Sequence, residues 1–180
     1  YGLVGSEMCI RDRLIAAGND TTRYSIAMAL YQLSLNNSLI RELKTNKYWG
    51  TCADEFIRLA SPTMYFRRTA TCNITFEGKK INKDDKVILW FVSGNRDEKV
   101  FQSPHTPIIS RSPNPHISFG QGGVHFCLGI WLARMEVRIL LEELIKNIDS
   151  KKPISEPTWT TSNFICGDKS LKAVSYTHLT

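Results

Sequence analysis

The sequence predicts a mainly α-helical protein with small β-sheets, the α+β class. Two long segments, 14–36 and 128–148, carry apolar residues at helical spacing. Between them, residues 62–86 alternate in the manner of strands, are rich in β-branched side chains and contain a turn signal at Gly78. A chain of 180 residues is long enough for one modest domain.

Composition and charge narrow the class of protein. The chain is 42% hydrophobic and 22% charged, which is ordinary for a globular protein. Its net charge of +6 comes from scattered residues, so we expect no nucleic-acid partner. No apolar run approaches the ~20 residues that span a bilayer, so we expect no stable membrane insertion. Five unclustered cysteines predict a reducing, cytoplasmic location without disulfides.

The first predicted helix, 14–36, has an unusual polar centre, A-G-N-D-T-T at residues 17–22. Gly18 costs this helix about 1 kcal/mol relative to alanine. One interpretation is that Asn19 or Asp20 caps a helix that starts there. The other is that the helix continues through the segment and the Thr21 hydroxyl bonds back to the Ala17 carbonyl. Local rules leave both interpretations open.

Two shorter helices are predicted next, at 38–43 and at 52–61, the second stopped by Pro62. In the second helix, Glu55 and Arg58 lie three residues apart and therefore on one face. An exposed pair of this kind contributes about 0–1 kcal/mol. The apolar neighbours instead indicate burial, and a buried pair needs further partners.

The remainder of the chain is predicted as strands, loops and one long helix. Residues 87–92, V-I-L-W-F-V, read as a strand that is buried on both faces. Residues 104–115 read as a proline-rich meander, and 153–174 as strands and a turn. The helix over 128–148 has an apolar stripe that we expect to face the core, formed by Val137, Leu140, Leu141, Leu144 and Ile148.

A glycine-rich loop, F-G-Q-G-G-V-H-F-C-L-G at 119–129, ends at this long helix. Cys127 therefore stands beside helix N–H groups that have no helical partner and carry partial positive charge. This environment favours a thiolate. From these residues alone, Cys127 could be a nucleophile, a metal ligand or an inert buried side chain.

The loop resembles the haem-binding signature of the cytochrome P450 family, in its soluble bacterial form. The pattern G-x-H-x-C-x-G is matched by Gly123, His125, Cys127 and Gly129, with Phe119 upstream. Three more segments resemble family motifs in the same order: A-G-N-D-T-T, E-x-x-R at 55–58 and F-R-R-T at 66–69. The resemblance implies the C-terminal portion of the cytochrome P450 fold. The long spacing from Phe119 to Cys127 resembles members that hydroxylate sterols and methyl-branched lipids.

The resemblance also implies roles for individual residues. The cofactor would be heme b (iron protoporphyrin IX), with Cys127 as the iron ligand. The other residues implied in cofactor binding are Ala17, Arg68, Phe119, Gly123 and His125. Arg68 would pair with a propionate, although a solvated strand edge would also explain it. Thr21 and Asp20 would be catalytic and deliver protons on the face opposite the cysteine. Further residues would brace the scaffold (Glu55, Arg58, Arg111) or touch substrate (Met64, Tyr65).

The implied activity is that of a cytochrome P450 monooxygenase, an oxidoreductase. It would insert one oxygen atom from O2 into a C–H bond of a hydrophobic small molecule, with a sterol or branched lipid favoured. A ferredoxin-type donor with its reductase would supply electrons, docking on a basic surface of Arg134, Arg138 and Lys146 that could equally be a solvated face. The alternatives are a non-catalytic haem-binding protein or an inactive truncated fragment.

The two ends of the chain depart from the family pattern. Residues 1–13 and 175–180 read as a non-native leader and tail, so that Cys9 and His178 would have no role. This leaves 14–174 as the C-terminal part of a cytochrome P450 catalytic domain.

Overall fold

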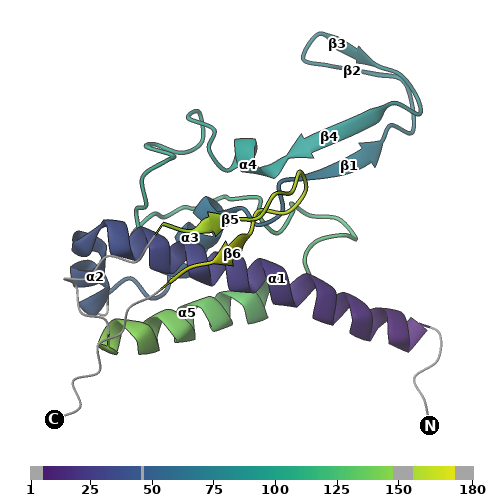
Figure 1. The fold of residues 1–180 in the computed structure, drawn as a ribbon. Coiled ribbons are helices and arrows are strands. Elements are labelled where there is room, and N and C mark those ends of the chain that lie inside the picture. The colour runs from purple at the N-terminus through teal and green to yellow at the C-terminus, as the bar shows by residue number, and fades with distance from the viewer. Residues whose placement is uncertain (1–5, 46, 148–155, 173–180) are drawn as a thin grey trace, which may run out of the picture.

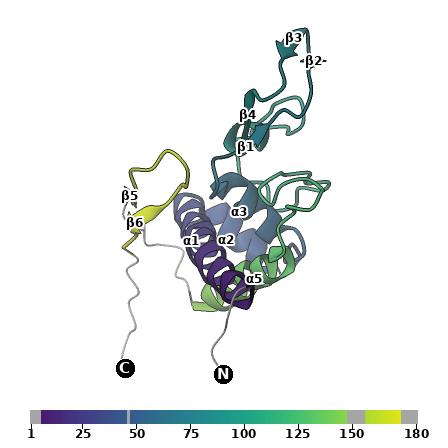
Figure 2. The same cartoon turned by 90° about the vertical axis from the view of Figure 1, so that its right-hand side faces the viewer.

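Four helices form the body of the protein. The computed structural model describes residues 6–45, 47–147 and 156–172. Helices α1 (Ser6–Leu35) and α5 (Ile130–Asn147) lie side by side, with α2 (Asn37–Lys44) and α3 (Cys52–Ala60) packed against them (Figures 1 and 2). Their shared core is built from aliphatic side chains of all four helices, among them Leu33, Leu43, Ile57, Val137 and Leu141.

The strands form three small antiparallel sheets outside this body. Strand β1 (Tyr65–Thr69) pairs with β4 (Lys86–Trp90), in a register that runs from Tyr65 opposite Trp90 to Thr69 opposite Lys86. The hairpin of β2 (Ile74–Phe76) and β3 (Lys79–Ile81) extends beyond them, at the end far from the helices (Figure 1). Its turn places Glu77 and Gly78 at φ values of 49° and 76°, as a two-residue type I′ hairpin requires.

A last hairpin, β5 (Thr158–Trp159) with β6 (Asp168–Ser170), returns to the body of the protein. An isolated bridge joins Thr63 to Ile165, and the rings of Trp159 and Tyr31 meet edge to face at 6.2 Å. This hairpin therefore connects α1 to the start of β1. The mainly helical architecture with small sheets confirms the predicted fold class.

The predicted first helix is confirmed, but its start is not at residue 14. Helix α1 continues without a break through the polar centre, which excludes the interpretation that Asn19 or Asp20 caps a new helix. It begins at Ser6, eight residues earlier than predicted, because residues 6–13 contain neither glycine nor proline to stop it.

The prediction that residues 87–92 form a strand buried on both faces is wrong. Strand β4 ends at Trp90, and Phe91 starts the single turn of α4 (Phe91–Gly94). Ile88, Leu89 and Trp90 are exposed. In the described part of the chain β4 pairs with β1 alone, so its faces remain uncovered although the sequence is continuously apolar.

The predicted core stripe of α5 is partly wrong. Val137 and Leu141 are buried, but Leu140 is exposed and Leu144 is only half-buried, while Ile145 takes its place in the core. Trp131 and Leu132 on other faces are exposed as well. Apolar residues surround much of this helix, so periodicity alone does not select the face that packs on α1.

Some predictions concern residues outside the described ranges. These are the end of the long helix at Ile148, the tail 175–180 with His178, and the first five residues of the leader. Among the described residues, no helix combines the length and the apolar character needed to cross a bilayer.

The orientation of α5 can be tested with neighbouring leucines. Leu141 is 0% exposed, so Leu141→Ala leaves a cavity and should lower the free energy of unfolding by about 2–5 kcal/mol. Leu140 is 36% exposed, and Leu140→Ala should cost about 1 kcal/mol or less. Chemical denaturation of both variants measures the difference. Equal losses would contradict the observed orientation.

Candidate functional site

The cysteine loop is closed by backbone hydrogen bonds directly before α5. The Cys127 N–H donates to the Phe119 carbonyl at 3.1 Å, and the Phe126 N–H donates to the Gly123 carbonyl at 3.2 Å. The Ala133 N–H donates to the Gly129 carbonyl at 2.9 Å, which starts the helical hydrogen bonding. Cys127 is half-buried. The sequence prediction that this cysteine lies at the N-terminal end of a helix is thus confirmed.

The glycines of the loop are needed for its backbone path. Gly120, Gly122 and Gly123 have φ values of 78°, 65° and 75°, in the left-handed region where other residues are strained. A Cβ atom added at any of the three would meet nothing within 4 Å. The backbone here therefore faces open space rather than packed protein, which leaves room for a bulky group.

A cavity of about 490 Å³ lies along this loop. It combines apolar walls, bare glycine backbone and three polar side chains, those of Arg68, Gln121 and His125. Val124, which is part of its lining, is 95% exposed. The residues that line the cavity are Arg68, Leu89, Phe91, Ile117, Gly120, Gln121, Gly122, Gly123, Val124 and His125.

Arg68 is the basic group that β1 contributes to this cavity. Its guanidinium lies 5.8 Å from the centre of the Phe66 ring, and its Nη1 donates to the Arg67 carbonyl at 3.0 Å. In the described part of the chain it forms no ion pair. Most of its five N–H donors therefore remain available for a carboxylate.

The polar centre of α1 shows the hydrogen bond that the second interpretation required. Thr21 Oγ1 donates to the Ala17 carbonyl at 2.7 Å. The Thr21 proton is thereby occupied, and the lone pairs of its oxygen can accept from another donor. Asp20 is exposed to solvent. Residues 17–21 do not line the cavity beside the cysteine loop.

Glu55 and Arg58 form a buried, bidentate pair, both with side chains 0% exposed. Arg58 Nε donates to Glu55 Oε2 at 2.9 Å, and Nη2 donates to Oε1 at 2.8 Å. Arg111 Nε adds a third contact, to Oε2 at 3.0 Å. The three residues that the sequence grouped therefore meet in space. The remaining Arg58 donor, Nη1, bonds the carbonyls of Asn95 and Pro104.

Further hydrogen bonds keep the Glu55 carboxylate charged. Its oxygens also accept from the Ile108 N–H at 2.9 Å and from Asn114 Nδ2 at 3.1 Å. Burial acts to raise the pKa of Glu55, but the bonds from Arg58 and Ile108 and the charges of Arg58 and Arg111 outweigh it, so the pKa lies below its ordinary value.

Sequence reasoning missed a second carboxylate centre next to this one. Asp54 Oδ1 accepts from His116 Nε2 at 3.0 Å and from Arg134 Nε at 2.7 Å. It also missed Asn95, which is fully buried and whose Oδ1 accepts from the Ile117 N–H at 2.8 Å. No local signal joins these residues, because their partners lie 22 to 80 positions away.

Met64 and Tyr65, the predicted substrate contacts, lie where β1 meets the last hairpin. The Met64 N–H donates to the Phe164 carbonyl at 2.9 Å. The Tyr65 ring lies 5.0 Å from the Trp90 ring and 5.5 Å from the Phe164 ring, centre to centre. The result is an aromatic cluster that includes Phe164, a residue the sequence did not single out.

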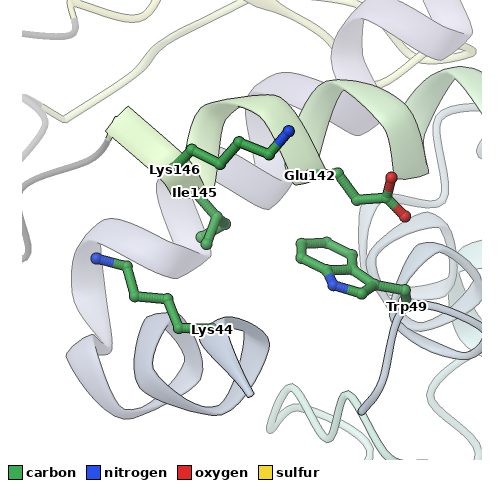
Figure 3. Close-up of a pocket in the computed structure, with 5 residues that line it drawn as sticks. All are labelled: Lys44, Trp49, Glu142, Ile145 and Lys146. Atoms are coloured by element: carbon green, nitrogen blue, oxygen red, sulfur yellow. The ribbon is translucent and has the colours of Figure 1, made fainter. Parts of the chain in front are cut away.

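A second cavity, of about 690 Å³, lies between α2 and the end of α5 and is lined by Lys44, Trp49, Glu142, Ile145 and Lys146 (Figure 3). Ile145 is fifteen residues beyond the first residue of α5, so this cavity is roughly 22 Å along the helix from the cysteine loop. Lys146 Nζ donates to Glu143 Oε1 at 2.6 Å. The cavity is therefore separate from the candidate site.

The remaining cysteines differ from Cys127 in their surroundings. All five carry free thiols. Burial raises the pKa of the Cys52 thiol to about 12 and also raises the pKa of Cys166. Cys9 and Cys72 are exposed and far in sequence from the loop. Cys127 is the cysteine whose loop lines a cavity, and it lies directly before the N-terminus of α5.

Comparisons with known proteins agree with this arrangement. The family profile for cytochrome P450 matches residues 46–172. The methyl-branched lipid omega-hydroxylase of Mycobacterium tuberculosis is 41% identical over 165 residues, which cover 88% of this chain and 37% of that protein. The steroid C26-monooxygenase of Mycolicibacterium smegmatis is 39% identical over 156 residues, covering 87% and 36%. The chain thus spans little more than a third of the length of these relatives.

Solved structures show the same fold. A Mycobacterium marinum cytochrome P450 in complex with pseudoionone superposes with a TM-score of 0.83 at 39% identity, covering 88% of this chain and 38% of that one. A Bacillus megaterium cytochrome P450 in complex with corticosterone gives 0.85 at 34%, covering 95% and 47%.

The fold, with its cysteine loop before a long helix and its buried E-x-x-R pair, is that of a class of haem-binding proteins. The chain belongs to the cytochrome P450 family.

The buried Glu55 centre can be tested by removing its charge. Glu55→Gln leaves two arginines without their anion and should lower the free energy of unfolding by about 3–5 kcal/mol. Because the folded pKa of Glu55 is depressed, its contribution is complete above the unfolded value of about 4.3 and is lost as pH falls through the folded pKa. The variant should therefore lose stability less steeply with acid than the unchanged chain does.

Denaturation curves between about pH 3 and 7 provide the measurement. The matched control is Glu143→Gln, whose carboxylate forms an exposed ion pair with Lys146 and should cost about 1 kcal/mol or less. An unchanged acid slope in Glu55→Gln would contradict the assignment.

Proposed function

We propose that residues 14–174 are the C-terminal part of a haem-thiolate monooxygenase in which Cys127 ligates the iron of heme b. The observation that carries the proposal is the cavity of about 490 Å³ that joins the cysteine loop to Arg68 on β1. Its lining fits a flat, largely apolar group with acidic substituents at one edge. Whole relatives are more than twice as long, and the remaining part of such an enzyme would complete the enclosure.

The residues present supply each kind of contact that heme b needs. Arg68 and His125 are placed to bind the two propionates, Arg68 with a planar fork that suits a carboxylate. Gly123 and its neighbouring glycines let the macrocycle approach the backbone closely. Leu89, Phe91 and Val124 offer apolar surface to the ring. Phe119 and Ala17, which the family resemblance also assigns to cofactor binding, do not line this cavity.

Cytochromes P450 are the standard example of haem held by a thiolate, which donates electron density to the iron and favours O–O cleavage when O2 is bound. In this chain, Cys127 stands directly before the N-terminus of α5, whose positive end would complement the negative charge of an iron-bound sulfur. N–H groups that bond the sulfur would tune the iron potential. The hydrogen bond from the Cys127 N–H to the Phe119 carbonyl holds the sulfur's own backbone in place.

Thr21 and Asp20 are the residues that we assign to proton delivery. The Thr21 oxygen retains lone pairs that can accept a proton donor while its own proton bonds Ala17. Asp20 is adjacent and exposed, so it can exchange protons with solvent. An acid that takes protons from water and an alcohol that passes them inward together form a general-acid relay.

The substrate that we propose is a hydrophobic small molecule, with a sterol or branched lipid favoured. Support comes from relatives named as a methyl-branched lipid omega-hydroxylase and a steroid C26-monooxygenase. The aromatic cluster of Tyr65, Trp90 and Phe164, with Met64 next to Tyr65 in the chain, offers the kind of surface that such a molecule contacts. One oxygen atom from O2 would enter a C–H bond.

We further propose a ferredoxin-type electron donor with its reductase, in the cytoplasm, where free thiols stay reduced. Arg138 and Lys146 are exposed on α5, in surface ion pairs with Glu142 and Glu143 that water weakens, and can attract an acidic partner. Arg134 is less suited to docking than the sequence implied, because Asp54 already binds its guanidinium.

Substitution of the proposed ligand is the direct test. Cys127→Ser should abolish the thiolate-type Soret band of the reduced CO complex in haem-loaded protein, because an alcohol is a far poorer iron ligand. Cys72→Ser, which alters an exposed thiol near the outer hairpin, should leave the band unchanged. Absorbance spectra of both variants give the answer, and a band that survives Cys127→Ser would overturn the ligand assignment.

The proton relay makes a separate prediction. Thr21→Ala should leave haem bound but lower the product formed per NADPH by about tenfold or more, with the electrons appearing as hydrogen peroxide. The control is Thr45→Ala, which removes a similar hydroxyl-to-carbonyl bond at the end of α2. Product and peroxide are measured with a generic ferredoxin and reductase. Normal coupling in Thr21→Ala would contradict its role, and no NADPH consumption in any form would favour a non-catalytic haem protein.

A further inference from the structure

One carboxylate oxygen connects α3, the cysteine loop and α5. Asp54, in the first turn of α3, uses Oδ1 to accept both His116 Nε2 at 3.0 Å and Arg134 Nε at 2.7 Å. His116 lies three residues before the loop begins at Phe119, and Arg134 lies in the second turn of α5. Asp54 lies 62 positions before His116 and 80 before Arg134, so this oxygen links the distant helix α3 directly to residues on both sides of the loop.

The two basic groups that Asp54 holds are both placed against the ring of Phe119. The imidazole of His116 lies 5.5 Å from that ring, centre to centre, at an interplanar angle of 52°. The guanidinium carbon of Arg134 lies 5.5 Å from the same ring and 5.2 Å from the ring of Trp131. Packing against His116 and cation–π attraction to Arg134 therefore both hold the Phe119 ring.

The backbone of Phe119 is hydrogen-bonded to the backbone of Cys127, so the position of Phe119 affects the position of the cysteine. Its carbonyl accepts the Cys127 N–H at 3.1 Å, which closes the loop, and the Gly120 N–H donates to the Ile117 carbonyl at 2.9 Å. We infer that Asp54, His116 and Arg134 are positioning residues that set where the Cys127 sulfur lies, by way of Phe119. They touch neither the sulfur nor the cavity, so they act through the loop.

Asp54 is the member on which the others depend. The His116 side chain is 2% exposed, and its Nδ1 is buried without a hydrogen-bond partner among the described residues. The hydrogen bond to the Asp54 carboxylate is therefore the one that fixes this imidazole. Burial acts to raise the pKa of Asp54, but the bonds from His116 and Arg134 outweigh it and hold the pKa below its ordinary value. The carboxylate is thus ionised and accepts from both partners.

Arg134 has a matched counterpart one turn later on the same helix. Arg138 forms a looser contact with Glu142, at 3.5 Å, and has no ring contact among the described interactions. If arginines on α5 mattered only through their charge, substitution of either would have the same effect. The inferred role predicts that only Arg134 affects the loop.

Amide hydrogen exchange of this chain, followed by mass spectrometry, tests the inference without any cofactor. Asp54→Ala and Arg134→Gln should speed exchange in peptides spanning residues 117–127 by about tenfold or more, which corresponds to one lost charge-assisted hydrogen bond. Arg138→Gln should change it less than twofold. Peptides from α2 serve as the internal reference for overall stability. If Asp54→Ala does not fold, Asp54→Asn, which retains an acceptor oxygen, should show a smaller acceleration in the same peptides.

Equal exchange in the Arg134 and Arg138 variants, or acceleration spread evenly over all peptides, would overturn the inference.

The haem-loaded protein provides a second measurement, and this part rests on the proposed function of Cys127. Asp54→Ala and Arg134→Gln should reduce the fraction of the thiolate-type Soret band and shift the reduction potential, while Arg138→Gln should not. A band that persists in Cys127→Ser would reject the proposed ligand but leave the exchange result intact. If Cys127→Ser loses the band but Asp54→Ala keeps both the band and normal hydrogen exchange, the ligand assignment stands and the positioning role is rejected.

Discussion

The buried ion pair between Glu55 and Arg58 is the constraint on which the segment leading to the cysteine loop depends. Two charges removed from water are stable only if every donor and acceptor finds a partner. Glu55 therefore collects Arg111, Asn114 and the Ile108 N–H, and Arg58 takes the carbonyls of Asn95 and Pro104. These partners belong to a segment without helix or strand, so the ion pair rather than secondary structure determines the path of residues 95–114.

The neighbouring Asp54 extends the same principle toward the cysteine loop. Helix α3 presents two successive carboxylates at its N-terminal turn, where the helix dipole favours negative charge. Glu55 organises the segment before the loop, and Asp54 holds the residues on either side of it. A short helix of nine residues thereby positions a loop that begins some sixty residues later. The chemistry proposed for Cys127 depends on that support, since a metal ligand must be held rigidly.

Features that depend on near neighbours could be predicted from the sequence. Helices α1, α2, α3 and α5, the turn at Gly78 and the Thr21 bond to Ala17 all follow from periodicity, turn residues or contacts four positions apart. The loop glycines and Cys127 were identified because their spacing is itself the signal. The predicted burial of β4 was wrong, and the predicted core face of α5 was partly wrong. An apolar side chain does not by itself indicate which element will pack against it.

The sequence by itself therefore determined the class of fold, the family resemblance and the candidate residues of the cysteine loop, since these reside in local patterns of a few residues. The tertiary structure decided which residues meet. It joined Asp54 to His116 and Arg134, set Phe164 against Tyr65 and opened the cavity between Arg68 and the glycine loop. Each of these contacts is made across a distance in sequence of more than fifty residues. Such contacts depend on how whole elements pack, and no short stretch of residues encodes that.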